Sequence, residues 1–163
     1  MNNPKISVIY LDMDGVIANF NKRYEELFNI KPEKADRSGI FGRQFDYFIA
    51  EGHFATLEMM PDAARLIEFL RKAPVPTQIL SSTAREDSHD EISKQKMIWL
   101  QTHGITFTPN FVPGKRLKKN YAKPDAIIID DTESVVDKWI DAGGLAVWHK
   151  NADSTLAILK MYI

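Results

Sequence analysis

The sequence predicts an α/β protein built on a parallel β-sheet that is flanked by helices. Short apolar runs rich in Ile and Val alternate with stretches of helical periodicity along the chain, and this alternation is typical of βαβ units. Two of these runs, Ile6–Leu11 and Ala126–Ile129, are followed directly by aspartates. With 163 residues, of which 44% are hydrophobic, the chain has the size of one domain with its own core.

The expected strands are short apolar segments bounded by turn residues. They cover residues 5–12, 75–80, 107–112, 126–130 and 145–148. A segment of helical periodicity separates most neighbouring strands, so we expect the strands to be parallel and the helices to cover the sheet.

The expected helices cover residues 18–28, 62–70, 90–102, 135–142 and 154–161. Pro61 precedes the second of them, in the place that proline favours at a helix start. Ser88 and Glu91 have the spacing of a capping box before the third, and Gly104 favours its end.

Residues 31–55 interrupt the alternation of strands and helices. Gly39, Gly42 and Gly52 separate short pieces that are rich in aromatic residues. We therefore expect this stretch to be an insertion that lies over the site rather than a part of the sheet.

Composition excludes several classes of function. The chain has no cysteine, which rules out disulfides, thiolate catalysis and cysteine-ligated zinc. The formal net charge is -1, which favours neither a nucleic acid partner nor its absence. No apolar run approaches the ~20 residues of a membrane span, and the N-terminal residues lack the apolar region of a secretory signal. A cytoplasmic protein without a membrane partner is the expectation.

The aspartates after two strands predict a magnesium site. Asp12 and Asp14 follow the first strand, and Asp130 and Asp131 follow the strand at 126–130. Ligands of open parallel sheets bind at the carboxyl edge of the strands. Carboxylates that meet there repel one another unless a cation or a shared proton neutralises them, and an oxygen-only cluster suits Mg²⁺.

The segment Asp12-Met13-Asp14-Gly15-Val16 predicts phosphoryl chemistry. Side chains two residues apart in an extended segment point to the same side, and Gly15 allows a tight turn out of the strand. One carboxylate can attack a phosphoryl group, while the second protonates the leaving oxygen and later activates water. The alternative, that these aspartates only cap helices and turns, explains less well why both groups follow the same kind of strand.

These motifs resemble the haloacid dehalogenase superfamily of phosphohydrolases. The resemblance rests on residues 12–16, on a serine at the tip of the next strand and on Asp130-Asp131. Residues 54–63 and 96–100 resemble in particular the 5'(3')-deoxyribonucleotidases and their bacterial and phage relatives. The resemblance implies a Rossmann-like sheet with a small helical cap after the first strand, with a core of residues 1–19 and 61–163 and a cap of residues 20–60.

The resemblance also implies roles for individual residues. Asp12 would be the nucleophile and Asp14 the general acid and base. Mg²⁺ would bind the Asp12 carboxylate, the Asp14 carbonyl and Asp130, with Asp131 as a ligand through water or an outer partner. The candidate phosphate-binding residues are Ser81, Ser82, Lys96 and Lys119, with Lys118 as an alternative to Lys119.

Other residues have ordinary structural explanations beside the functional ones. Lys96 could belong to a solvated helix face, and the basic segment 114–123 could be an exposed loop. That segment could also steer an anionic substrate or contact a nucleic acid backbone. Phe41 and Phe45 of the cap could stack a base or simply pack.

The leading hypothesis is a Mg²⁺-dependent phosphomonoesterase that hydrolyses nucleoside monophosphates through an aspartyl-phosphate. A phosphatase acting on 3'- or 5'-phosphate ends of nucleic acid is the first alternative, and a non-catalytic nucleotide-binding module is the second. Related enzymes are often dimers, so a homodimer is an expectation to test.

Overall fold

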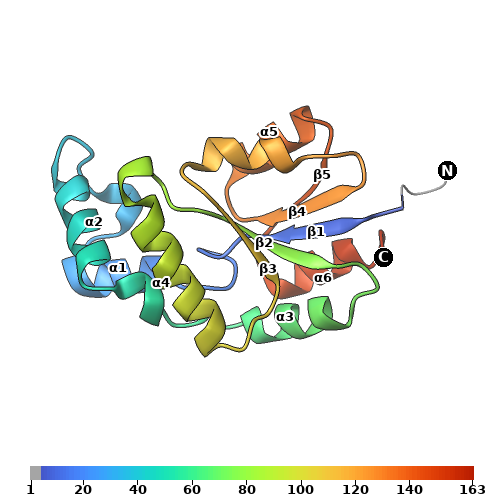
Figure 1. The fold of residues 1–163 in the computed structure, drawn as a ribbon, viewed down its shortest axis with the longest axis horizontal. Coiled ribbons are helices and arrows are strands. Elements are labelled where there is room, and N and C mark those ends of the chain that lie inside the picture. The colour runs from blue at the N-terminus through green and yellow to red at the C-terminus, as the bar shows by residue number, and fades with distance from the viewer. Residues whose placement is uncertain (1–4) are drawn as a thin grey trace.

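The computed structural model describes residues 5–163 and confirms the α/β fold class (Figure 1). Five parallel strands form one sheet in the order β3-β2-β1-β4-β5. The strands are β1 Val8–Leu11, β2 Thr77–Ser82, β3 Thr108–Val112, β4 Ala126–Asp130 and β5 Leu145–Trp148. Each lies within the expected segment or within two residues of it.

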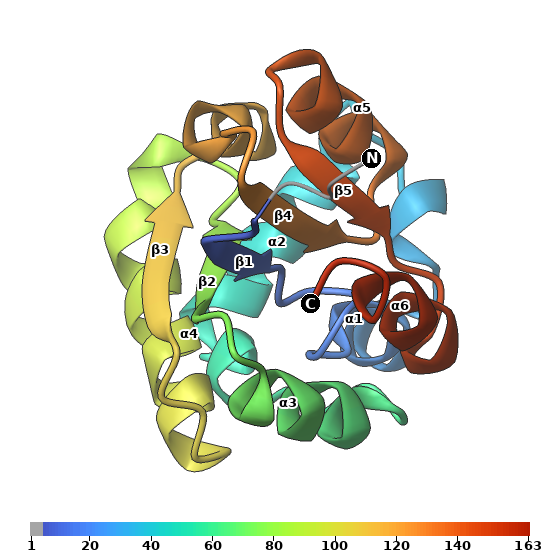
Figure 2. The same ribbon diagram turned by 90° about the vertical axis from the view of Figure 1, so that its right-hand side faces the viewer.

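Helices cover both faces of this sheet and the end at which the strands finish (Figures 1 and 2). They are α1 Phe20–Phe28, α2 Ile40–Ala50, α3 Ala63–Lys72, α4 His89–Thr102, α5 Glu133–Asp141 and α6 Ala152–Leu159. Short 3₁₀ helices cover Pro32–Lys34 (η1), His53–Thr56 (η2), Glu86–Ser88 (η3) and Lys115–Tyr121 (η4). Within residues 5–163, no helix is long and apolar enough to cross a lipid bilayer.

The two faces of the sheet bury alternate residues of the central strands, as the two-residue period of a strand requires. Ile9, Leu11, Ile127 and Ile129 belong to one hydrophobic cluster with residues of α3, α4 and α6. The residues between them in the sequence, including Tyr10 and Ile128, pack in a second cluster with α5 and η4. Burial on both faces explains why the strands read as continuous apolar runs.

The register of the sheet brings the ends of three strands together. Leu11 pairs with Ile79 on one side and with Ile129 on the other. The backbone N–H of Asp12 still donates to the carbonyl of Ile129, at 3.0 Å. Asp12 therefore leaves the sheet beside the last residue of β4 and near the end of β2.

Residues 20–60 form α1, η1, α2 and η2, which lie at the end of the molecule beyond the strand tips (Figure 1). Phe45, Phe48 and Phe54 of this region are buried in the same hydrophobic cluster as one face of the sheet. We expected only short pieces separated by glycines, but α2 runs unbroken through Gly42. Burial of Phe45, Phe48 and Ile49 on one side of α2 outweighs the cost of one glycine, about 1 kcal/mol.

Helix α4 joins the 20–60 region to the rest of the protein through side chains that bond to backbone groups. Gln95 donates to the carbonyl of Ile49 at 2.8 Å and accepts from the N–H of Phe54 at 3.2 Å. The Trp99 indole donates to the carbonyl of Leu57 at 2.7 Å. Because these groups are buried, their loss would leave unpaired polar atoms, so the region is held firmly on α4.

The expected capping box at Ser88 and Glu91 is wrong. The hydroxyl of Ser88 accepts from Arg85 Nε and donates to Asp87, while Glu91 accepts from Gln95. The chain enters α4 through η3, and no side chain of Ser88 caps the helix. The basic segment 114–123 also differs from the expected loop, because Lys115–Tyr121 forms η4.

We expect the stability of the 20–60 region to fall in mild acid because of His53. Arg23 donates to Nδ1 of this ring at 3.0 Å, and an arginine can only donate. Burial lowers the pKa of His53, and the charge of Arg23 lowers it further. A histidine with a lowered folded pKa contributes stability above its unfolded pKa, about 6.5, and that stability is lost as the pH falls below this value.

The measurement is thermal unfolding of the wild type and of His53→Gln at pH 7.5 and pH 5.5. Glutamine can still accept a hydrogen bond from Arg23 but does not titrate. The unfolding temperature of the wild type should fall more between these pH values than that of the variant. Equal falls would show that His53 is not the group responsible.

Candidate active site

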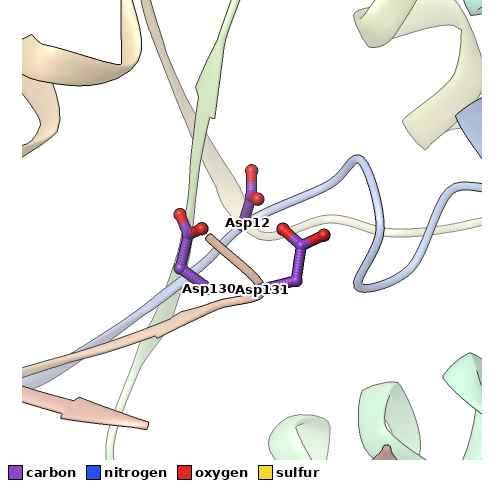
Figure 3. Close-up of side chains that lie close together, drawn as sticks. All are labelled: Asp12, Asp130 and Asp131. Atoms are coloured by element: carbon purple, nitrogen blue, oxygen red, sulfur yellow. The ribbon is translucent and has the colours of Figure 1, made fainter. Parts of the chain in front are cut away.

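Three aspartates from two neighbouring strand ends point into one space at the carboxyl edge of the sheet (Figure 3). They are Asp12, directly after β1, Asp130, the last residue of β4, and Asp131. One carboxylate oxygen from each lies within 4.8 Å of the others. We call these three residues the acidic cluster.

The loop after β1 turns sharply and carries Asp14 to the same space. The carbonyl of Met13 accepts from the N–H groups of Val16, Ile17 and Ala18, which closes a turn directly after the strand. The N–H of Met13 donates to Oδ1 of Asp12 at 2.8 Å. This bond fixes the orientation of the Asp12 carboxylate.

Gly15 has no room for a side chain because Asp131 occupies that space. Its φ is +80°, and a Cβ built there would lie 2.0 Å from Oδ2 of Asp131. Two independent features therefore require glycine at position 15: the left-handed backbone conformation and the close carboxylate of Asp131.

We expect Gly15→Ala to destabilise the protein and to displace Asp131. The left-handed backbone alone costs an alanine about 1–2 kcal/mol, and the contact with Asp131 adds to this. Gly52→Ala is the matched control, since Gly52 has φ +73° and nothing within 4 Å of its Cβ position. Urea unfolding should show a larger loss for Gly15→Ala, and equal losses would mean that Asp131 moves away freely.

Lys118 neutralises two members of the acidic cluster. Its Nζ lies 2.9 Å from Oδ1 of Asp12 and 2.6 Å from Oδ2 of Asp130. The side chain is buried, with 2% of the residue exposed. Burial by itself lowers the pKa of Lys118, but the two carboxylates outweigh it and hold the pKa well above its usual range. Lys118 is therefore a permanent positive charge.

Lys96 makes a second buried contact, on the other side of the site. Its Nζ donates to Oδ2 of Asp14 and to the hydroxyl of Ser81, both at 2.7 Å. Lys96 and Ser81 are almost completely buried, so Lys96 does not belong to a solvated helix face. The other oxygen of Asp14, Oδ1, is buried and has no hydrogen-bond partner within residues 5–163.

Electrostatics within the acidic cluster favour a bound cation. Burial raises the pKa of Asp12, the charge of Asp130 raises it further, and Lys118 opposes both. Asp131 is more exposed than the other two aspartates, but partial loss of water around its carboxyl group, together with the charges of Asp12 and Asp130, raises its pKa to about 7. One lysine thus leaves the repulsion between three carboxylates only partly relieved. Three oxygen ligands with excess negative charge fit a hard divalent cation such as Mg²⁺.

A cavity of about 420 Å³ opens onto these residues. Asp12, Asp14 and Asp131 lie in its floor and walls, together with Lys118 and Ser82. Its remaining walls include four aromatic residues from the 20–60 region, namely Phe20, Phe41, Phe45 and Phe54. A volume of this size lies within the range of small-molecule sites, about 300–1,000 Å³.

The structure separates the residues that the sequence proposed for phosphate binding. Ser82 lines the cavity, and its hydroxyl accepts from the N–H of Ala84. Ser81 and Lys96 lie behind Asp14, in contact with each other. Lys119 lies on the surface in a separate hollow with Lys138, away from the acidic cluster. Of the two lysines left open by the sequence, it is Lys118 that contacts the aspartates.

Sequence reasoning missed several residues that line the cavity, among them Arg37 and Thr83. Two other lining residues were considered without a definite role. Phe54 is one of the aromatic residues of the 20–60 region that could stack a base or simply pack, and Lys115 belongs to the basic segment 114–123 that could steer an anionic substrate. Arg37 lies in a polar stretch of the sequence that contains no recognisable motif. Nothing in its spacing from the aspartates indicates that it lines the same cavity.

Solved structures similar to this one include hydrolases of the haloacid dehalogenase (HAD) superfamily. A hydrolase from Streptococcus pneumoniae TIGR4 matches with a TM-score of 0.56 and 14% identity, over 96% of this chain and 99% of the other. A HAD-superfamily hydrolase from Ehrlichia chaffeensis matches with a TM-score of 0.54 and 14% identity, over 99% and 98%. A HAD family hydrolase from Deinococcus radiodurans R1, with bound phosphate and sodium, matches at 0.53 and 14%, over 96% and 88%. At this identity the likeness concerns the fold.

The fold, with aspartates at the ends of β1 and β4, is that of a haloacid dehalogenase-type hydrolase. The sequence profile of one family within this class matches residues 6–147, which is most of the chain. The chain belongs to that family, described as the 5' nucleotidase, deoxy (pyrimidine), cytosolic type C proteins. It is therefore an enzyme of the phosphatase and nucleotidase class. None of the curated proteins matches the chain significantly in sequence.

Proposed function

We propose that the protein is a Mg²⁺-dependent phosphomonoesterase that hydrolyses nucleoside monophosphates through an aspartyl-phosphate. The observation that carries this proposal is the acidic cluster, held by Lys118 at the floor of a cavity that Asp14 also lines. Family membership supports phosphate ester hydrolysis. The cytosolic type in the family's description supports a cytoplasmic location, and a homodimer remains an expectation.

Asp12 is the nucleophile in this proposal. Both Met13 N–H and Lys118 bond to its Oδ1, and this leaves Oδ2 for attack. A bond forms between this oxygen and phosphorus as the ester P–O bond breaks. When bound at the acidic cluster, Mg²⁺ would neutralise charge so that an anionic ester can approach a carboxylate.

Asp14 moves the proton in both half-reactions. It gives a proton to the leaving oxygen as the aspartyl-phosphate forms, and it takes one from the water that then attacks phosphorus. Lys96 donates to Oδ2 of Asp14 at 2.7 Å and so fixes the carboxyl group that would carry the proton. Hydrolysis releases inorganic phosphate and restores the Asp12 carboxylate.

The substrate class follows from the shape and lining of the cavity. Its lining combines charged residues, among them Asp12, Asp14 and Lys118, with aromatic rings, including those of Phe41 and Phe45. A phosphate joined to a flat, apolar base matches this combination. Phe41 and Phe45 also stack on each other, with ring centroids 5.7 Å apart, and the Arg37 guanidinium lies over the Phe41 ring, so these contacts hold the aromatic side of the cavity in place.

The test is phosphate release from nucleoside monophosphates, sugar phosphates and 3'- or 5'-phosphorylated oligonucleotides, with Mg²⁺ and with EDTA. We expect release from nucleoside monophosphates with Mg²⁺ and none with EDTA. Release from oligonucleotides alone would establish instead the phosphatase of nucleic acid ends. Nucleotide binding without release from any substrate would leave only the binding module.

A further inference from the structure

The cations that line the cavity fall into two kinds. Lys118 is already paired with Asp12 and Asp130. Arg37 and Lys115 also line the cavity, but neither has a carboxylate within 4.0 Å among the residues that the structure describes. Within residues 5–163, two positive charges therefore line the cavity without a carboxylate to pair with.

Arg37 is held in place although it is exposed. Its Nη2 donates to the carbonyl of Pro32 at 2.9 Å, and its guanidinium lies over the ring of Phe41, 3.7 Å from the centroid. These contacts occupy one N–H hydrogen and one face of the Arg37 guanidinium. The remaining donors of the planar fork are free to bind an anion, for which their geometry is suited.

Lys115 is placed by the 3₁₀ helix η4. Residues three apart in such a helix lie on the same side, and Lys115 is three residues before Lys118. Both line the cavity, whereas Arg116 and Lys119 are absent from its walls. The helix therefore sorts four neighbouring basic residues into two that face the site and two that do not.

We call the four aspartates and the two buried lysines, Lys96 and Lys118, the inner site. The inner site has no excess positive charge that could attract an incoming phosphate. It holds four carboxylates (Asp12, Asp14, Asp130 and Asp131) and two buried lysines that are bonded to three of them, a net charge of -2 when all are ionised. A divalent cation at the acidic cluster would bring this charge to zero. Attraction of a doubly negative ester must then come from charges outside the inner site.

We propose that Arg37 and Lys115 form an anion-capture pair at the cavity, which attracts the phosphate dianion of the substrate and favours dianionic esters over less charged ones. One residue comes from the 20–60 region and the other from η4, so two separate parts of the chain contribute positive charge to the cavity lining. The pair acts on substrate capture rather than on bond breaking. This inference rests on the proposed function only for the identity of the ester.

The test is the double variant Arg37→Gln/Lys115→Gln, compared with Arg43→Gln/Lys119→Gln. The control also removes one charge from the 20–60 region and one from η4, but neither residue lines the cavity. Hydrolysis of a nucleoside monophosphate is measured at several salt concentrations. We expect kcat/KM of the first variant to fall about tenfold or more at low salt, with kcat unchanged and with a weaker dependence on salt. The control should resemble the wild type.

Binding of inorganic phosphate, measured by calorimetry with Mg²⁺ present, gives a readout that needs no turnover. The dissociation constant should rise in the first variant and stay unchanged in the control. Equal effects in both double variants would overturn the proposal, because bulk charge alone would explain them. A fall in kcat with KM unchanged would overturn it as well. If the wild type releases phosphate from no nucleotide, the proposed function fails, but phosphate binding still decides the role of the pair.

Discussion

Replacing Asp12 by asparagine is expected to reduce phosphate release by a factor on the order of 10⁴ or more, the scale seen when a catalytic nucleophile is removed. Asparagine has nearly the same shape, and its carbonyl oxygen can still accept from Met13 N–H and Lys118, as Oδ1 of Asp12 does. A neutral amide, however, is a poor nucleophile toward phosphorus. The measurement is phosphate release from the best nucleotide with Mg²⁺.

The stability of this variant provides its control. Burial and Asp130 raise the pKa of Asp12, so the folded protein disfavours the charged carboxylate that asparagine replaces. In EDTA at neutral pH, the unfolding temperature of Asp12→Asn should therefore equal or exceed that of the wild type. Asp125→Asn, at the opposite end of β4, should keep full activity. Wild-type turnover by a folded Asp12→Asn protein would exclude the aspartyl-phosphate mechanism.

The position of the aspartates could be predicted because it depends on sheet geometry alone. Two buried strands that run in parallel end at the same edge, and an aspartate directly after each must lie near the other. The pairing of Leu11 with Ile129 shows this arrangement. No knowledge of loops or side-chain packing was needed for that inference.

The lysines could not be assigned from the sequence because local structure decides between neighbours. Lys118 and Lys119 are both basic, and counting residues back from Asp130 does not distinguish them. The 3₁₀ helix η4 turns Lys118 inward and leaves Lys119 exposed. A 3₁₀ helix of a few turns is too short to produce a clear hydrophobic periodicity in the sequence. The segment 114–123 was therefore expected to be a loop.

Arg37 and the unbroken helix α2 could not be predicted for a related reason. Helix α2 depends on long-range packing of aromatic rings, such as Phe20 against Phe48 and Phe54, and Arg37 lies over the ring of Phe41 from that helix. Sequence spacing records periodicity within an element, but not which distant elements it packs against. The capping box at Ser88 failed for a local reason instead, because Arg85, three residues earlier, donates to the hydroxyl that was expected to cap α4.

Replacing Lys118 by methionine is expected to lower the free energy of unfolding in EDTA by about 3–5 kcal/mol, the cost of leaving a buried charge without its partner. Methionine has a similar length and no charge. Its presence would leave Asp12 and Asp130 facing each other, and both are buried. Lys119→Met is the control, since Lys119 is exposed and such changes stay within about 0.5 kcal/mol.

Mg²⁺ distinguishes the electrostatic role of Lys118 from simple packing. If the loss comes from uncompensated carboxylates, a divalent cation at the acidic cluster should restore part of it, because a ligand that binds only the folded state stabilises that state. Urea unfolding of Lys118→Met with EDTA and with Mg²⁺ measures this, and we expect a larger gain from Mg²⁺ than in Lys119→Met. Equal stability of the two variants in EDTA would show that the aspartates do not need the lysine. A loss that Mg²⁺ leaves unchanged would point to packing, and the acidic cluster would then no longer be a credible metal site.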